Sequence, residues 1–433
     1  MALSTVLVGT SACGSWWGDN IAPPLPGERI SVLRHETALQ PDAQTDTSEI
    51  RLPAPSPTPD WPQSGGYANH AMYHVAAAPH LSEAWTREIG SGTSAGQRFT
   101  SGPIVADGLI YAIDVYSKVT AFNAQTGRRI WSINLTPDKE DDGHIPGGLA
   151  YENGRVFVGT GFAQVIALDA KTGQVIWRKG VGAPVHSAPT VRGGRVFVVS
   201  LDNTLHALSA EDGSQLWLHN GSPETAMLLG GASPAVDNGI VVVPYSSGEL
   251  AALKVENGRE LWMESLSSRR RTDSTASMAH IRANPVIDRG RVFAISHSGL
   301  MVSIDLNSGR RVWEKDIGGQ QSVWVAGDYI FTLTGNEELA AIERDTGRVL
   351  WVKSLPRWID PEIFEGPIVW TGPLLVSDRL IVANSQGLAV AISPYTGKIL
   401  GSENMPDGVS VAPIVAGNMV YFLADDATLA AYQ

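Results

Sequence analysis

From residue 100 to the C-terminus, the chain repeats one pattern of short apolar runs and turns. Each copy contains an apolar triplet, a Gly or Asp turn, two apolar runs separated by a polar turn, and a T-G-x-x-x-W phrase. Runs such as 195–199 and 204–208 are too short for helices and rich in β-branched residues, which favours strands. They are apolar on both faces, as expected of strands between two neighbouring sheets. Each copy therefore predicts a sheet of four short strands, A to D.

The spacing inside the copies is constant. A proline that opens strand A lies 28 residues before a tryptophan on strand D in four copies, Pro103 to Trp131, Pro189 to Trp217, Pro234 to Trp262 and Pro285 to Trp313. The connections between copies vary in length. A constant unit on variable connectors is typical of a repeat architecture.

The number of copies predicts the architecture. Seven complete units begin near residues 100, 147, 186, 231, 282, 320 and 370, and an eighth, over 411–432, lacks its D strand. Residues 83–88, with Trp85, supply a strand of that kind at the other end of the chain. We therefore predict an all-β fold over residues 80–433, an eight-bladed β-propeller of four-stranded antiparallel blades, closed by pairing of this N-terminal strand with the C-terminal blade.

One tryptophan holds the same place in nearly every repeat. A residue that recurs at one position of a repeated unit indicates a structural role, here a ring wedged between adjacent blades rather than a ligand platform. The residues assigned to this role are Trp85, Trp131, Trp177, Trp217, Trp262, Trp313 and Trp351.

The N-terminal region differs in composition from the repeats. Residues 1–12 are apolar and end in small residues before Cys13, the single cysteine, which is similar to a bacterial lipoprotein cleavage site. We expect a signal peptide remnant over 1–12 and a lipid on Cys13; the alternative is a free thiol. Residues 13–79 are Pro-rich and predict an extended tether.

Composition narrows the possible partners. The formal net charge is −12 and the pI is about 5.3, which disfavours binding to nucleic acid. One cysteine excludes an intrachain disulfide, and no apolar run reaches the ~18 residues that span a bilayer.

Catalytic motifs match weakly. Residues 92–96 fit G-x-S-x-G, but that motif needs a strand-to-helix turn, and the acidic stretch 138–143 has Leu149 where a calcium loop needs Glu. The ten histidines show no metal-ligand spacing; His186, His206 and His297 are expected to pack on or beside blade strands. The sequence predicts no catalytic residue, no metal, no cofactor and no enzyme.

The T-G-x-x-x-W repeat resembles the quinoprotein-like propellers, which include dehydrogenases dependent on pyrroloquinoline quinone (PQQ). A periplasmic oxidoreductase of that kind is the alternative hypothesis. The phrases at 24–30, 60–63 and 428–432, with Cys13, are more similar to the BamB family. That resemblance implies a lipoprotein at the periplasmic face of the outer membrane, within the β-barrel assembly (BAM) complex. It also implies binding to the POTRA domains of BamA and assistance to nascent outer-membrane proteins.

The variable connections predict where a partner binds. The gap from a strand-D tryptophan to the next strand-A position ranges from 10 residues after Trp313 to 23 after Trp262. All of this variation lies in D–A connections, which share one rim of a propeller with the B–C turns. Variable loops on a rigid scaffold favour recognition, so we expect the partner on this rim.

The resemblance also points to particular residues. Met227, Leu228 and Leu229 fall at or beside the family's apolar contacts, whereas Gly230 stands in place of an arginine, and His280 and Arg282 in place of two acidic residues. Two further sets are candidates: Arg269, Arg270 and Arg271, which would otherwise be a solvated basic loop, and Trp358 and Phe364, as exposed anchors or as a cap on the propeller.

Overall fold

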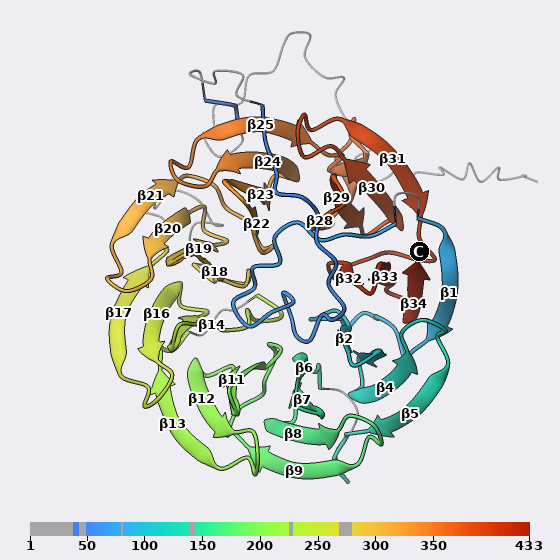
Figure 1. The fold of residues 1–433 in the computed structure, drawn as a ribbon, viewed down its shortest axis with the longest axis vertical. Coiled ribbons are helices and arrows are strands. Elements are labelled where there is room, and N and C mark those ends of the chain that lie inside the picture. The colour runs from blue at the N-terminus through green and yellow to red at the C-terminus, as the bar shows by residue number, and fades with distance from the viewer. Residues whose placement is uncertain are drawn as a thin grey trace, which may run out of the picture. The chain divides into compact units, whose positions relative to one another are not determined.

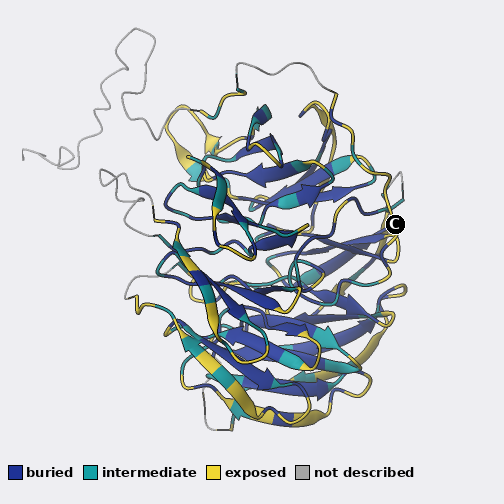
Figure 2. Ribbon diagram, turned by 60° about the vertical axis from the view of Figure 1, so that its left-hand side comes forward, coloured by how far each residue is buried: buried dark blue, intermediate teal, exposed yellow. Residues whose placement is uncertain are grey.

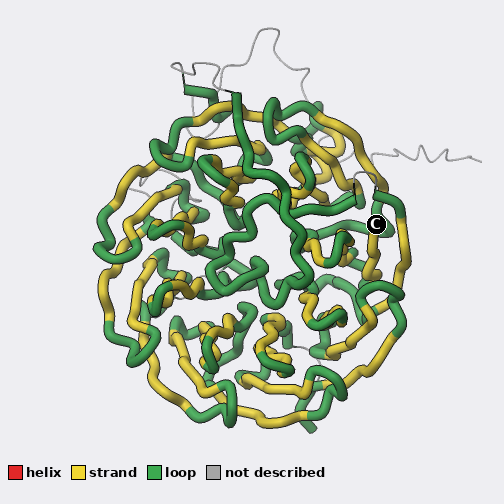
Figure 3. The backbone as a smooth tube through the Cα atoms, viewed as in Figure 1, coloured by secondary structure: helices red, strands yellow, loops and turns green. Residues whose placement is uncertain are grey.

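A computed structural model describes residues 38–42, 49–78, 81–138, 140, 144–224, 228–267 and 279–433. The described residues from Leu39 onward form one compact unit of strands, turns and loops (Figures 1 and 3). Eight four-stranded antiparallel sheets surround a central channel, which confirms the predicted eight-bladed propeller. No helix long and apolar enough to cross a membrane occurs in the part of the chain described.

The first four blades each comprise four consecutive strands, in the order A to D from the channel outward. Blade 1 contains β2 (Ile104–Ala106), β3 (Leu109–Ile113), β4 (Lys118–Asn123) and β5 (Arg129–Asn134). Blade 2 contains β6 (Gly148–Glu152), β7 (Arg155–Thr160), β8 (Gln164–Asp169) and β9 (Val175–Gly180). Blade 3 contains β10 (Thr190–Arg192), β11 (Arg195–Val199), β12 (Thr204–Ser209) and β13 (Gln215–Asn220). Blade 4 contains β14 (Ala235–Asp237), β15 (Ile240–Pro244), β16 (Glu249–Lys254) and β17 (Glu260–Ser265).

The remaining blades follow the same order, with an added hairpin before blade 7. Blade 5 contains β18 (Val286–Asp288), β19 (Arg291–Ile295), β20 (Met301–Asp305) and β21 (Arg311–Lys315). Blade 6 contains β22 (Trp324–Ala326), β23 (Tyr329–Leu333), β24 (Glu338–Glu343) and β25 (Val349–Ser354). The hairpin is β26 (Trp358–Asp360) with β27 (Glu365–Pro367), and blade 7 contains β28 (Trp370–Val376), β29 (Arg379–Asn384), β30 (Leu388–Ile392) and β31 (Ile399–Asn404). Blade 8 contains β32 (Ile414–Ala416), β33 (Met419–Leu423), β34 (Thr428–Tyr432) and β1 (Glu83–Glu88).

Blade 8 closes the ring with strands from both ends of the propeller. Strand β1 pairs antiparallel with β34, from Glu83 opposite Tyr432 to Glu88 opposite Thr428. Just beyond the strand, Ser82 and Gln433 exchange two backbone hydrogen bonds of 2.9 Å. The predicted closure is confirmed.

The recurring tryptophans join each blade to the next. Each indole N–H donates a hydrogen bond to a backbone carbonyl of the following blade. The bonds run from Trp85 to Ala124 (3.1 Å), Trp131 to Ala170 (2.9 Å), Trp177 to Ala210 (3.2 Å), Trp217 to Val255 (3.1 Å), Trp262 to Leu306 (2.7 Å), Trp313 to Arg344 (2.9 Å) and Trp351 to Pro394 (2.9 Å).

The glycine of the T-G phrase leaves room for this ring. A Cβ at Gly213, whose φ is +73°, would lie 2.7 Å from the Trp177 ring of the preceding blade. The seam from blade 7 to blade 8 has Gly401 in the tryptophan position, with no atom within 4 Å of its Cβ direction. Blade 8 has no C–D turn, because the chain ends occupy that place. The tryptophan is therefore missing at the seam where its glycine partner is also missing.

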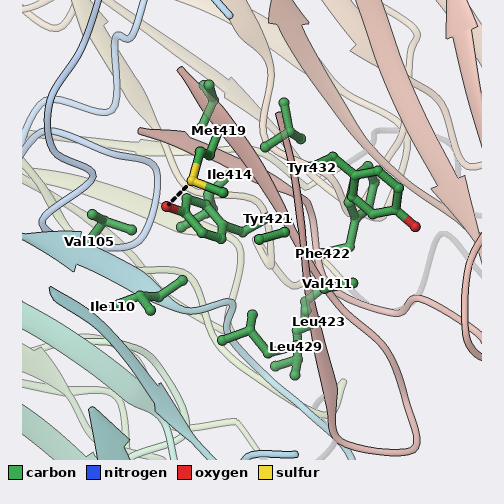
Figure 4. Packing of buried hydrophobic residues seen from close by; sticks show 14 of the residues in the cluster. Val105, Ile110, Val411, Ile414, Met419, Tyr421, Phe422, Leu423, Leu429 and Tyr432 are labelled. Carbon is green, nitrogen blue, oxygen red and sulfur yellow. Dashed lines mark hydrogen bonds between the residues drawn. The ribbon is translucent and has the colours of Figure 1, made fainter. Parts of the chain in front are cut away.

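The core lies between the blades. The middle strands are buried along most of their length, as in β15, whereas outer strands such as β13 alternate exposed and partly buried residues (Figure 2). At the seam between blades 8 and 1, Val105 and Ile110 belong to the same cluster as Tyr421 and Leu429 (Figure 4). The Tyr421 hydroxyl donates to the Ala124 carbonyl across this seam at 3.2 Å. Burial on both faces explains the continuous apolar runs.

The two rims of the ring differ. On one, which we call the D–A rim, the residue that follows strand D donates to the B–C turn of its own blade, as from Leu266 to Gly248 (2.8 Å) and from Leu355 to Glu337 (2.9 Å). On the other, the A–B rim, C–D turns bond to A–B turns, as from Ala124 to Gly108 (3.0 Å). Both long connections, after β17 and after β25, leave from the D–A rim, as expected.

Residues 49–78, here called the cap segment, lie across the centre of the ring (Figure 1). They accept hydrogen bonds from every blade in ring order. The donors and acceptors are Gly417 N to Thr58 O (2.8 Å), Val105 N to Trp61 O (2.9 Å), Tyr151 N to Pro62 O (2.7 Å), Val191 N to Gln63 Oε1 (2.9 Å), Val236 N to Ala68 O (2.7 Å), Ile287 N to Asn69 O (2.9 Å), Trp324 Nε1 to Tyr73 O (2.6 Å) and Ser377 N to Val75 O (2.9 Å).

These hydrogen bonds place the start of the propeller domain earlier in the chain than the predicted residue 80. The donors lie on the inner strands or the A–B turns, so the cap segment covers the free inner edges of the blades at the A–B rim. Leu39 and Asp42 also bond to blade 6, through Glu338 and Val349. The sequence predicts an extended tether up to residue 79. In the structure, the described residues of 39–78 belong to the propeller instead, because their backbone carbonyls complete its sheets.

We predict that a methyl group added where the tryptophan packs lowers the free energy of unfolding by more than a strained left-handed backbone alone does. Gly213→Ala combines a disfavoured φ, ~1–2 kcal/mol, with overpacking against Trp177, ~1–3 kcal/mol. Gly239→Ala is the matched control, since Gly239 has φ +75° and open space around its Cβ. Urea denaturation should show the larger loss for Gly213→Ala; equal losses would contradict the seam contact.

The cap segment should be sensitive to acid through His70. Its Nδ1 lies 2.7 Å from the Pro285 carbonyl, and burial lowers the pKa of His70 from 6.5 to about 4. The pKa of His70 is lower in the folded protein than in the unfolded protein, so the unfolded protein binds more protons between pH 6.5 and 4. The contribution of His70 to stability is therefore complete above pH 6.5 and is lost as the pH falls towards 4. The stability difference between wild type and His70→Gln should therefore shrink by up to ~3 kcal/mol across that range. A pH-independent difference would contradict this assignment.

Candidate partner-binding surface

The D–A rim of blades 4 and 5 brings together several of the predicted partner residues. The connection before β14 carries Leu228, Leu229 and Gly230, and the connection before β18 carries His280 and Arg282. The Leu229 side chain is 44% exposed. The Leu228 N–H donates to Nδ1 of His280 at 3.0 Å, so the two connections are in contact.

His280 stabilises this contact in its neutral form. Its side chain is buried, and burial lowers its pKa to about 4, with further lowering by Arg282 and His297. Because Nδ1 accepts the Leu228 N–H, it carries no proton. Neutral His280 therefore acts as a structural acceptor that positions the loop bearing Leu229.

Arg282 carries a partly buried charge. Its Nη1 donates to Oε1 of Gln320 at 3.1 Å, and burial lowers the pKa of the guanidinium. Among the residues that the structure describes, no carboxylate lies within ion-pair distance of it. A Cβ on Gly230 would lie 3.4 Å from Arg282 Nε, so the side chain packs directly beside blade 4.

This packing concerns the charged positions at which the chain differs from the residues expected from the BamB resemblance. Gly230 falls where the family has an arginine, and the guanidinium of Arg282 lies against Gly230. A positive group supplied by blade 5 therefore lies beside Gly230. Sequence position alone did not indicate this, because the side-chain direction depends on a neighbour more than 50 residues away.

The second long connection forms the β26–β27 hairpin. Trp358 pairs with Pro367 and Asp360 with Glu365, and the Trp358 and Phe364 rings meet edge to face at 5.9 Å. Phe364 is 62% exposed and has a φ of +57°, which is uncommon for a bulky residue. Trp358 is half-buried. The exposed fraction of Phe364 favours the anchor interpretation over the cap interpretation for that residue.

The other sequence-based sites fall into two groups. Cys13, Met227, Arg269, Arg270, Arg271 and most of the acidic stretch 138–143 lie outside the described residues. The G-x-S-x-G match at 92–96 lies in the loop between β1 and β2, where Thr93 bonds to Asp425, with no helix after it. Within the described ranges, no group of three or more His, Cys, Asp or Glu residues is placed to hold a metal ion.

Comparison with known proteins settles the family. The model of the family described as outer membrane protein assembly factor BamB matches residues 115–353 and 356–433. The chain belongs to the BamB family. BamB of Escherichia coli (strain K12) is 29% identical over 358 residues, covering 80% of this chain and 87% of that protein. BamB of Moranella endobia is 24% identical over 344 residues, covering 78% and 86%.

Solved structures share the architecture with BamB and with enzymes. The crystal structure of BamB from Moraxella catarrhalis has a TM-score of 0.69 at 17% identity and covers 82% of this chain and all of that one. Quinohemoprotein alcohol dehydrogenase from Comamonas testosteroni has a TM-score of 0.67 at 16% identity, covering 87% and 81%. At such identities these likenesses show the fold alone. Assignment to BamB therefore rests on the family match and the sequence relatives.

Proposed function

We propose that the protein is a non-catalytic scaffold of the BAM complex that binds the POTRA domains of BamA and assists insertion of outer-membrane proteins. Membership of the BamB family supports the assembly role. The observation that carries the binding site is the exposed Leu229 beside Arg282 on the D–A rim, where two connections from adjacent blades meet. Arginine is enriched at interfaces relative to the rest of the protein surface, and an exposed Leu beside it adds apolar area that a partner can bury.

The rim suits docking of a folded domain. The cap segment covers the A–B rim, whereas the D–A rim carries the connections that vary in length. Phe364, Ile359 and Ile363 are 62%, 62% and 57% exposed on the β26–β27 hairpin, and this second apolar group lies on the same rim. We assign Leu228, Leu229, Gly230, His280 and Arg282 to the main contact and the hairpin to a secondary one.

Membrane attachment completes the proposal. A lipid on Cys13 would hold the chain at the periplasmic face of the outer membrane, beside the complex. Residues 14–37 then separate the anchor from the propeller, because the residues from Leu39 onward belong to the propeller unit.

Leu229→Asp should weaken binding to purified BamA POTRA domains at least 10-fold, because a buried Leu contributes ~1.5–3 kcal/mol and ~1.4 kcal/mol corresponds to a factor of ten. Leu216→Asp on the outer strand β13 is the control, since Leu216 is 45% exposed against 44% for Leu229. Biolayer interferometry measures both variants. Unchanged binding of Leu229→Asp, or an equal loss in both, would contradict the site.

Cys13→Ser, expressed with its signal sequence intact, should move the protein from the membrane fraction to the soluble periplasmic fraction. The anchor requires the thiol to which the lipid is attached, and the propeller itself does not change. Fractionation followed by immunoblotting measures this, with wild type as the control. Retention of Cys13→Ser in the membrane fraction would argue against lipidation.

A further inference from the structure

The central channel contains a cavity of about 160 Å³. Trp61, Ser64, Gly65 and His70 of the cap segment line one end of it, and residues that precede or begin the inner strands line its walls. Because the cap segment covers the A–B rim, the cavity opens towards the D–A rim. It is smaller than the ~300 Å³ of the smallest typical ligand pockets, so it suits a small group rather than a large cofactor.

Arg282 gives this cavity a positive charge that no carboxylate among the described residues compensates. The guanidinium lines the cavity, and its hydrogen-bond partner is the neutral amide of Gln320. Burial lowers its pKa, and no carboxylate of the described residues lies within ion-pair distance of it, but a guanidinium stays protonated in proteins. A buried charge without a counter-charge is costly, and the channel therefore favours an anion at this place.

Two further polar atoms of the cavity lining have no hydrogen-bond partner. They are Nε2 of His70 and Oγ of Ser101, and both are buried. His70 is buried, and its Nδ1 bonds to the Pro285 carbonyl, so Nδ1 carries the proton and Nε2 is a free acceptor. Native proteins leave few such groups unpaired. The Ser101 hydroxyl can donate to an anion, whereas Nε2 of His70, as an acceptor, needs a donor such as water.

The net charge of the groups around the cavity indicates which kind of anion would fit. His70 and His280 have pKa values of about 4 because of burial, and burial also lowers that of His297, so these neighbours are neutral at pH 7. Arg282 then supplies one positive charge. A singly charged carboxylate matches it, whereas a phosphate with nearly two negative charges would bring an unbalanced one into the channel.

We infer that the central channel is a carboxylate-binding pocket, in which the guanidinium of Arg282, with Gln320 beside it, holds a carboxylate that enters from the D–A rim. The carboxylate comes either from an acidic side chain of the partner docked on that rim or from a small free carboxylic acid. The first source rests on the proposed function; the pocket itself does not.

Fluorine NMR of the full chain in detergent, labelled with 5-fluorotryptophan, tests the pocket. Trp61 lines the cavity and stacks on Trp324 with ring centroids 6.2 Å apart, and Trp61→Phe identifies its resonance among the 13 tryptophans. Sodium acetate at pH 7, with sodium chloride at equal ionic strength as the reference, should shift the Trp61 resonance in a saturable way. Phosphate should give a weaker effect at the same concentration.

Arg282→Gln should weaken the acetate response at least 10-fold, and Arg282→Lys, which keeps the charge, should retain part of it. Arg192→Gln is the control, because Arg192 is exposed at the end of β10 in blade 3. Arg282→Gln should also unfold at the same or a higher temperature, since it removes a buried unpaired charge; a purely structural arginine would give a lower one. No Trp61 shift, or an equal shift in Arg282→Gln, would overturn the pocket.

Binding of the BamA POTRA domains by the same variants distinguishes the sources. If Arg282→Gln loses both acetate and POTRA binding, the partner supplies the carboxylate. If it loses acetate binding alone, the occupant is a free carboxylic acid. If wild type binds acetate but no POTRA domain, the pocket stands and the proposed function fails.

Discussion

The contact between the tryptophan of one blade and the C–D turn of the next is the interaction on which the ring depends. The indole N–H reaches a carbonyl across the seam, and its ring lies where any Cβ on the turn glycine would be, as for Trp177 and Gly213. Both partners must stand at fixed places in the repeat, which explains the constant 28 residues from strand A to strand D. At the seam before blade 8 the chain ends replace the turn, and β1 pairing with β34 closes the ring instead.

This requirement constrains the two rims differently. The A–B rim holds the turns that receive the tryptophans, and the cap segment accepts hydrogen bonds from all eight blades there. A change in length at this rim would disturb a seam or an edge bond. The D–A connections contribute neither a tryptophan contact nor a bond to the cap segment, so the β26–β27 hairpin and the loop bearing Leu229 are less constrained in length. Recognition and variation therefore share the D–A rim.

The sequence predicted the blades, their number and their closure because each depends on a residue type that recurs with a period. The cap segment has no such signal: its bonds are made mainly by backbone carbonyls, such as those of Trp61 and Ala68, which any residue carries. Its prolines suggest a tether equally well. For the candidate site, position along the chain identified Leu229 and Arg282 as neighbours on one rim. The isolation of the Arg282 charge, and its contact with Gly230, depend on packing between blades that no local pattern encodes.

That contact shows that position along the chain does not give the charge distribution of this surface. Read by position, the chain loses an arginine at Gly230 and gains a positive charge at Arg282, which looks like a reversal of the ionic part. In space, the Arg282 guanidinium lies beside Gly230, with Nε 3.4 Å from where a Cβ would be, and its Nη1 donates to Gln320. The cation beside Gly230 therefore comes from the loop of blade 5. Because the loops of adjacent blades converge at the channel mouth, a side chain from one blade can bring a charge to the loop of the next, and the seams that hold the blades in register fix this arrangement.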